Sequence, residues 1–561
     1  MEKPHWKTLC SRYFLISLFF TAGLIGFEFF LFPRYYESFN TINFLQSGVY
    51  IKPLKTFALA VPCFLLSVFF VFAALISPYR YKILYFALFC LSVLIEYGYQ
   101  DAFNRFSNSE DAANALFAAD SRIMFNSMSG YFDNLAILPC LAFAFLLIFI
   151  KPIQAKGLKT FLLTLALFVG FFSLTAYFTT NYFPSASLNA FYRTGIGFPV
   201  RWYIGSLTQP ALIVFYNAPR QKVSFEGQRE PDNNIVFIVD ESMRGDHLSL
   251  NGYARQTTPF LEQLNQNGMI KNWGIAVSGT TCSINSNNLL LTGVSELPDI
   301  KGNIYQFPTV FQYAKAMGYK NFYFDGQLSY RWNGKSGDVE DFGKWVTSDD
   351  LQQENWFEND AEIARRVKEI VGNSTGNFIW INKFGVHTPY FDSYPDSASV
   401  WLPIPQKNGK FSLFADKSKP EELVNNYDNA VLYNTQSFFT NLLEDGLAEN
   451  TFYVYTSDHG QNLGENGKTL SHCSNTKNEA NVPLFIVADP RIMPDADTTF
   501  RASHSNIFPT LLDLMNFPET ERQQKYSLSL FNAGGADSKP RFYFEGNLNG
   551  RFSNGKYLFD Q

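Results

Sequence analysis

The chain has 561 residues, a formal net charge of −5, and 47% hydrophobic residues against 17% charged residues. Soluble domains usually carry about 25% charged residues, so this composition rules out a disordered chain and argues against an entirely soluble protein. The acidic balance also gives no indication of a general basic surface for nucleic acid.

Long apolar runs are concentrated before residue 180. Five of them approach the length of about 20 residues that a membrane-spanning helix requires, and they lie at residues 13–32, 57–76, 83–99, 135–150 and 161–178. Lysine and arginine mark the cytoplasmic side of a membrane protein. They precede the first run and lie between runs two and three and between runs four and five, which places the N-terminus in the cytoplasm. An odd number of spans puts the rest of the chain outside, and a count of four would reverse this orientation.

A connector is expected at 180–230, where the chain is aromatic and contains four prolines. Its short amphipathic stretches are typical of a segment lying on the membrane surface, and an ordinary ordered linker is the alternative. The expected organisation is therefore a transmembrane domain of five helices at 1–179, an interfacial connector at 180–230 and a domain outside the cytoplasm at 231–561.

Residues 231–561 have the sequence pattern of an α/β domain. Apolar, strand-like runs are expected at residues 235–239, 321–324, 378–381, 452–455 and 484–487. Helices are expected after the N-cap residue Thr258, with Pro259 in the first helical position, across 308–317, and from 283 to 291. Continuous apolar strands that alternate with helices predict a mostly parallel sheet covered on both faces.

Polar side chains follow three of these strands. Glu241 comes after the run at 235–239, His387 after 378–381, and Asp458 and His459 after 452–455. Because open α/β sheets build their sites at the carboxyl ends of strands, we expect these side chains to meet at one edge. Carboxylate and imidazole donors together suit zinc, with manganese as an alternative. Taken singly, such an acid is usually a helix cap and such a histidine is more often structural than a ligand. Asp458-His459-Gly460, followed by a glycine-rich loop and His472, is the sharper signal.

A nucleophile is expected in the turn Ser-Gly-Thr-Thr-Cys-Ser at 278–283, between an apolar run and a helix-like stretch. A hydroxyl in such a turn can sit at a helix N-terminus, where backbone N–H groups favour a phosphate. A bound divalent metal would activate that hydroxyl for attack. A Ser/Thr-rich turn with a simple helix cap is the alternative.

Five ordered motifs resemble those of the bacterial inner-membrane phosphoethanolamine transferases, which belong to the alkaline-phosphatase and sulfatase superfamily. They lie at residues 239–253, 257–259, 384–390, 457–467 and 503–509. The N-terminal part with five spans is similar too. The resemblance implies a sulfatase-like domain and a two-step transfer. A metal-activated threonine takes phosphoethanolamine from phosphatidylethanolamine, releases diacylglycerol, and passes the group to lipopolysaccharide, on lipid A or a core sugar.

The resemblance also implies roles for individual residues. The zinc site with its nucleophile corresponds to Glu241, Asp458, His459 and Thr281. The residues that hold the phosphate or a second zinc ion correspond to His387 and His472. Predicted contacts with the lipid substrate are made by Asn114, Asp120 and Lys383, of which Asp120 is expected to bind the ethanolamine ammonium.

Some positions depart from the family pattern. Cys282 stands where the family nucleophile would fall, so we expect a turn shorter by one residue and choose Thr281 over Thr280 because it directly precedes the helix. Of the six cysteines, Cys282 and Cys473 alone lie after the predicted membrane part, and the sequence leaves their pairing open.

Particular residues disfavour three other functions. A glycerophosphate transferase of the lipoteichoic acid synthase type shares the superfamily, but the motif at 241–253 argues against it. A sulfatase is disfavoured because no proline and arginine follow Cys282 as they do around a formylglycine precursor. A metal-free lipid-binding scaffold would not need Glu241, Asp458 and His459. We expect a monomeric, multi-pass enzyme of the inner membrane, with its catalytic domain in the periplasm, one or two zinc ions and no nucleic acid partner.

Overall fold

The computed structural model describes residues 230–295, 304–327, 336–404, 420–465, 470–473, 476–534, 540–544 and 556–560, together with 219–223, 225 and scattered positions at 12–19, 22, 68, 71–72, 75 and 83. The chain divides into two compact units, Met1–Ala211 and Leu212–Gln561. In the first unit the described positions are helical, and Tyr13 packs against Val71 and Leu75. None of the helices in the described part of the chain has both the length and the apolar character to cross a membrane. The five predicted spans are described only at these positions, and Asn114 and Asp120 lie outside the described residues.

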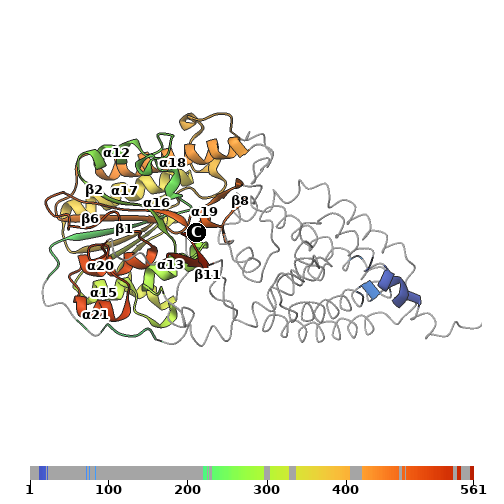
Figure 1. The fold of residues 1–561 in the computed structure, drawn as a ribbon, viewed down its shortest axis with the longest axis horizontal. Coiled ribbons are helices and arrows are strands. Elements are labelled where there is room, and N and C mark those ends of the chain that lie inside the picture. The colour runs from blue at the N-terminus through green and yellow to red at the C-terminus, as the bar shows by residue number, and fades with distance from the viewer. Residues whose placement is uncertain are drawn as a thin grey trace, which may run out of the picture. The chain divides into compact units, whose positions relative to one another are not determined.

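A seven-stranded mixed sheet forms the centre of the second unit (Figure 1), in the order β2-β9-β6-β1-β5-β3-β4. Its strands are β1 Asn234–Asp240, β2 Ile270–Val277, β3 Lys320–Asp325, β4 Lys344–Val346, β5 Asn377–Asn382, β6 Thr451–Ser457 and β9 Asn481–Val487. Strands β6, β1, β5, β3 and β4 are parallel, whereas β9 is antiparallel to both β6 and β2. The five predicted strands are confirmed, and the prediction of a mostly parallel sheet holds for every pair except the two made by β9.

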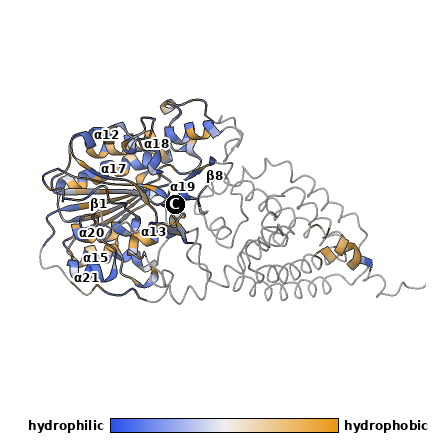
Figure 2. Ribbon diagram, in the orientation of Figure 1, coloured by the Kyte–Doolittle hydropathy of each residue, from blue (hydrophilic) through white to orange (hydrophobic). Residues whose placement is uncertain are grey.

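Helices cover both faces of this sheet. They are α12 Pro259–Gln266, α13 Ser283–Thr292, α15 Val310–Ala316, α16 Ser348–Leu351, α17 Trp356–Asn373, α18 Pro420–Leu443, α19 Lys477–Ala480, α20 Ile507–Leu514 and α21 Glu519–Lys525. Figure 1 shows α12, α17 and α18 on one face and α13, α15, α20 and α21 on the other. Hydrophobic and hydrophilic residues are mixed along these helices (Figure 2), as expected where one side faces a sheet.

Smaller elements complete the unit. Two antiparallel pairs are formed by β7 Asn462–Leu463 with β8 Leu470–Ser471, and by β10 Phe542–Phe544 with β11 Lys556–Leu558. Short 3-10 turns lie at η4 Gly245–His247, η5 Ser249–Asn251, η6 Ser336–Asp341, η7 Tyr390–Asp392, η8 Asp396–Ala398 and η10 His504–Asn506.

The central strand β1 explains why two helical layers are needed. All of its residues are buried, and its side chains alternate between the two faces. Val236 and Ile238 belong to the hydrophobic cluster shared with α12, α17 and α18, whereas Phe237 and Val239 belong to the cluster shared with α13, α15 and α20. A continuous apolar run is therefore the sequence signature of a strand covered on both sides.

One predicted helix start differs in detail. Thr258 occupies the N-cap position of α12 and Pro259 is the first helical residue, as expected. The Thr258 hydroxyl makes no capping bond; it accepts a hydrogen bond from the backbone N–H of Leu250 at 2.9 Å instead. The predicted cap is thus right in position and wrong in its hydrogen bond, because a neighbouring turn competes for the oxygen.

Candidate metal centre

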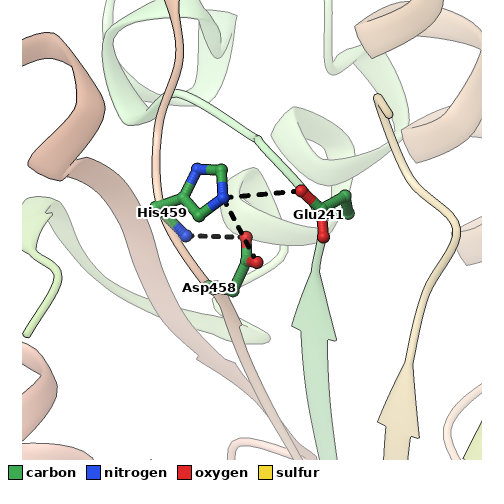
Figure 3. A group of neighbouring side chains, drawn as sticks. All are labelled: Glu241, Asp458 and His459. Atoms are coloured by element: carbon green, nitrogen blue, oxygen red, sulfur yellow. Dashed lines mark hydrogen bonds and ion pairs between the residues drawn. The ribbon is translucent and has the colours of Figure 1, made fainter. Parts of the chain in front are cut away.

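Glu241, Asp458 and His459 lie together just beyond β1 and β6 (Figure 3). Because these strands are adjacent and parallel, with Asp240 opposite Ser457, the residues that follow them emerge at the same sheet edge. One ligand atom from each of the three side chains lies within 4.8 Å of the others. None of the three residues is more than 2% exposed, so the cluster is shielded from bulk water.

The spacing and the histidine tautomer both fit a tetrahedral metal ion. His459 Nε2 lies 3.5 Å from Asp458 Oδ2 and 3.6 Å from Glu241 Oε1. Ligand atoms on a tetrahedral zinc ion with bonds of about 2.0–2.1 Å lie about 3.3–3.4 Å apart. His459 Nδ1 lies 2.6 Å from the carbonyl oxygen of Gly460, which can only accept, so Nδ1 carries the proton. Nε2 therefore presents its lone pair to the two carboxylates, as a metal ligand requires.

Asp458 has one oxygen that is engaged and one that is not. Its Oδ1 accepts hydrogen bonds from the backbone N–H groups of Ser242, at 3.1 Å, and His459, at 2.7 Å. Within the described part of the chain, no donor is within hydrogen-bond distance of Oδ2, although the residue is only 1% exposed. A buried carboxylate oxygen without a partner is costly. A cation held between Asp458, Glu241 and His459 would remove that cost.

The pKa values of Asp458 and Glu241 also favour a bound cation. Burial and the neighbouring Glu241 carboxylate raise the pKa of Asp458 well above its usual range. Burial also acts to raise the pKa of Glu241, but His459, two further histidines and a hydrogen bond from Ser242 outweigh it and lower this pKa to about 2. Two carboxyl groups this close cannot both ionise readily without a counter-charge. The residues present therefore fit a divalent cation of the zinc type.

Glu241 is held in place by neighbours on both sides. Its Oε1 accepts from the Ser242 hydroxyl at 2.7 Å, and its Oε2 accepts from Gln327 Nε2 at 3.2 Å. Behind it, Gly385 has a φ of +58°, and a Cβ on this residue would stand 2.1 Å from Asp240 Oδ1. Gly385 is thus required both by its backbone conformation and by the close approach of the loop to the end of β1.

His387 and His472 lie beside the three-residue cluster. The His472 ring centroid is 4.4 Å from that of His459, and its Nδ1 is 3.2 Å from Gln461 Oε1. His387 Nδ1 is 2.6 Å from the carbonyl oxygen of Thr388. Both histidines act electrostatically on the Glu241 carboxylate. They flank the cluster without belonging to its group of three neighbouring ligand atoms.

The turn expected to carry the nucleophile lies at the same place, between β2 and α13. Thr281 is fully buried, its N–H donates to Phe544 O at 3.3 Å, and its carbonyl accepts from Cys473 N at 2.7 Å. Cys282 forms a disulfide with Cys473, which resolves the pairing that the sequence left open. Ser283, the first residue of α13, places its Oγ 2.9 Å from His459 Nε2.

Lys383 is part of the interior. It is fully buried, its Nζ lies 2.5 Å from Asp240 Oδ2, and it sits 4.6 Å from the centre of the Phe438 ring. These contacts support a structural role at the base of the site, and they give no support to the predicted contact with substrate.

Two residues near the cluster escaped the sequence-based prediction. Gln327 follows β3 and donates to Glu241 Oε2 at 3.2 Å and to Lys383 O at 2.7 Å. The sequence places Ser283 at the end of the predicted turn but assigns it no role. Gln327 lies after a predicted strand, and this position was the signal available for it; the contact of Ser283 depends on the rotation of α13, which no motif specifies.

Comparison with known proteins gives consistent results. The sulfatase family profile matches residues 233–517. The Escherichia coli phosphatidylethanolamine transferase Mcr-1 is 27% identical over 319 residues, which cover 50% of this chain and 53% of that protein. Phosphoethanolamine transferase EptC of Escherichia coli K12 is 26% identical over 317 residues, which cover 54% of this chain and 50% of that protein. The chain thus matches about half the length of these curated relatives.

The fold of this chain is also similar to those of solved structures. The integral membrane lipooligosaccharide phosphoethanolamine transferase A (EptA) from Neisseria meningitidis matches 90% of this chain and 95% of its own, with a TM-score of 0.59 and 21% identity. The C-terminal periplasmic domain of EptC from Escherichia coli in complex with zinc matches 61% of this chain and 97% of its own, with a TM-score of 0.50 and 21% identity.

Proposed function

The chain belongs to the sulfatase family, and from this premise we propose that it transfers phosphoethanolamine from phosphatidylethanolamine to lipopolysaccharide. Curated relatives that match it are named as transferases of this group. The observation that carries the proposal is the buried cluster of Glu241, Asp458 and His459, in which one carboxylate oxygen has no donor among the described residues.

In this proposal Glu241, Asp458 and His459 hold a zinc ion. Zinc supplies positive charge that activates an adjacent hydroxyl and stabilises charge on phosphoryl oxygens. His387 and His472, which flank the cluster, hold the phosphoryl oxygens or a second zinc ion. This role is supported by the His472 ring, whose centroid is 4.4 Å from that of His459, and by the effect of both histidines, which lower the pKa of Glu241.

The proposed reaction has two steps. A hydroxyl of the turn at 280–283, for which the sequence predicts Thr281, attacks the phosphorus of phosphatidylethanolamine. The bond from phosphorus to the glycerol oxygen breaks, and that oxygen leaves as diacylglycerol with the proton lost by the hydroxyl. A hydroxyl or phosphate oxygen of lipopolysaccharide then attacks the phosphorus and displaces the protein oxygen, which regains a proton.

In this proposal the first unit anchors the catalytic domain to the membrane. The donor is a membrane lipid, so its headgroup lies at the bilayer surface, and the predicted spans hold the catalytic domain there on the periplasmic side. Asp120 pairs with the ethanolamine ammonium, and Asn114 lies in the same predicted outer loop.

The direct test uses the full chain with fluorescent phosphatidylethanolamine and lipopolysaccharide. We expect diacylglycerol to be released and phosphoethanolamine to appear on lipopolysaccharide by mass spectrometry. Glu241→Ala should lower the release by at least about 100-fold, because it removes a metal ligand. Glu362→Ala, on the outer side of α17 and paired with Arg365 and Arg366, is the matched control and should leave it unchanged. Release of glycerophosphate from phosphatidylglycerol instead would favour a transferase of the lipoteichoic acid synthase type.

A further inference from the structure

We propose that Ser283, rather than its neighbour Thr281, supplies the hydroxyl that completes the metal cage and carries the covalent phosphoethanolamine. The inference rests on the transfer reaction proposed above and names the attacking residue of the same site.

The contact with His459 is the first argument. Ser283 Oγ lies 2.9 Å from His459 Nε2. The N–H group at His459 Nδ1 donates a hydrogen bond to the Gly460 carbonyl. Nε2 is therefore an acceptor, and the serine hydroxyl donates a hydrogen bond to it. The serine oxygen is therefore directed at the same nitrogen lone pair that faces the two carboxylates.

The donor set is the second argument. His459 Nε2 has three oxygens around it: Ser283 Oγ at 2.9 Å, Asp458 Oδ2 at 3.5 Å and Glu241 Oε1 at 3.6 Å. These separations bracket the spacing of about 3.3–3.4 Å between ligand atoms on a tetrahedral zinc ion. Two carboxylates, one imidazole and one hydroxyl make four metal ligands, and Asp458 Oδ2, which has no hydrogen-bond donor among the described residues, is open to a cation.

The side chains of Thr280 and Cys282 are bonded elsewhere, and Thr281 is less accessible than Ser283. Thr280 Oγ1 donates to the Cys282 carbonyl at 3.1 Å, and the Cys282 sulfur is bonded to Cys473. Thr281 is fully buried and is fixed by backbone hydrogen bonds to Phe544 and Cys473, whereas Ser283 is only half-buried. A nucleophile has to be reached by a lipid headgroup, which favours the more accessible hydroxyl.

The position of Ser283 also suits a phosphorylated product. It opens α13, a helix of ten residues, so the first N–H groups of this helix lack intrahelical partners. A phosphoryl group on the Ser283 oxygen would lie close to these donors and to the positive end of the helix dipole.

Each of the two proposed steps forms one bond to phosphorus and breaks another. The Ser283 Oγ–H bond is lost as Oγ bonds to phosphorus, the bond from phosphorus to the glycerol oxygen breaks, and the proton passes to that oxygen to give diacylglycerol. The acceptor oxygen then bonds to phosphorus, the Oγ–phosphorus bond breaks, and the acceptor's proton returns to Oγ.

The covalent adduct locates the nucleophile. The purified full chain is incubated with zinc and phosphatidylethanolamine without acceptor, digested, and analysed by tandem mass spectrometry. We expect phosphoethanolamine on Ser283 in the wild type, in Thr281→Ala and, on the threonine oxygen at 283, in Ser283→Thr. Ser283→Ala should carry no adduct and should release diacylglycerol at least about 100-fold more slowly. An adduct on Thr281, or full activity of Ser283→Ala, would overturn the assignment.

Zinc affinity tests the cage without reference to turnover. By chelator competition, Ser283→Ala should bind zinc roughly ten-fold more weakly than the wild type, while Thr281→Ala should match the wild type. The reverse ranking would show that Thr281 completes the cage. If the wild type binds zinc with this ranking but releases no diacylglycerol, the cage assignment stands and the proposed transfer reaction fails.

Discussion

Asp458 shows how one side chain can be poorly placed for the fold and well placed for a ligand. Its raised pKa means that the folded, metal-free protein holds the Asp458 proton more tightly than the unfolded chain does. The associated stability is complete below the ordinary aspartate pKa of about 3.9 and is lost as the pH rises through the raised value. At neutral pH the metal-free site is therefore destabilised by its own charge.

Asp458→Asn should remove this penalty. The amide oxygen can still accept from Ser242 N and His459 N, and the amide nitrogen can donate to Glu241. We expect the thermal unfolding midpoint of the metal-free chain to rise by about 2–4 °C at neutral pH. The gain over the wild type should shrink as the pH falls to about 4.

Zinc should reverse the order of the thermal unfolding midpoints, so that the wild type becomes more stable than Asp458→Asn. Adding Zn²⁺ should raise the midpoint of the wild type and leave Asp458→Asn unmoved, because a bound ion stabilises only the form that holds it. Asp445→Asn, at an exposed ion pair with Lys368, is the control and should change neither midpoint by much. An equal response of wild type and Asp458→Asn to zinc would contradict the assigned site.

The sequence predicts the three residues of the metal cluster but not all of their neighbours. Glu241, Asp458 and His459 were found because each directly follows an apolar strand, and strand ends meet at a sheet edge. Ser283 and Gln327 were not found because their contacts depend on side-chain direction from a helix and a loop. The burial of Lys383 against Asp240 could not be foreseen either, since a lysine directly after a strand looks exposed in the sequence; its predicted contact with substrate stays a prediction.

The loop after β5 is the element that supports Glu241 from behind. Gly385→Ala would put a methyl group 2.1 Å from Asp240 Oδ1 and 2.8 Å from the Glu241 backbone nitrogen, at a φ that favours glycine. We expect loss of zinc binding together with a drop in stability on the order of 1–3 kcal/mol, measured by chelator competition and urea unfolding. Gly372→Ala, with nothing within 4 Å in α17, should instead leave zinc binding intact and be neutral or slightly stabilising.

The same loop is anchored by the buried ion pair of Lys383 and Asp240. Lys383→Met leaves Asp240 charged and uncompensated, so the free energy of unfolding should fall by about 3–5 kcal/mol in urea titration. Lys368→Met removes an exposed ion pair with Asp445 and should cost less than about 1 kcal/mol. A stable Lys383→Met protein with weakened binding of phosphatidylethanolamine would restore the substrate role that the sequence indicated.

Strand positions were predictable because apolar runs between polar turns identify buried strands. Strand direction was not: β9 was expected as a strand, but its antiparallel direction was not foreseen, because its run Asn481–Val487 is as continuously buried as that of β1. The edge strand β2 is only partly buried and carries a register shift near Gly274 against β9, so its apolar pattern is weaker.

For the whole molecule, the predicted orientation has a direct consequence. With five spans and a cytoplasmic N-terminus, a C-terminal reporter should be exported, so an alkaline phosphatase fusion should be active and a fluorescent-protein fusion dark. Equal fusions placed at the N-terminus should give the opposite pair of signals. An active C-terminal reporter of the cytoplasmic type would mean an even number of spans.

The disulfide between Cys282 and Cys473 fastens two segments separated by 191 positions in the chain, and each segment borders a residue of the site. Such bonds form in oxidising compartments and are kept reduced in the cytosol. With the predicted export of this domain, the covalent link between the turn at 278–283 and the His472 segment would form only after the chain has crossed the bilayer. For the proposed transferase, the site would then be fully cross-linked only in the compartment where its predicted lipid substrate lies.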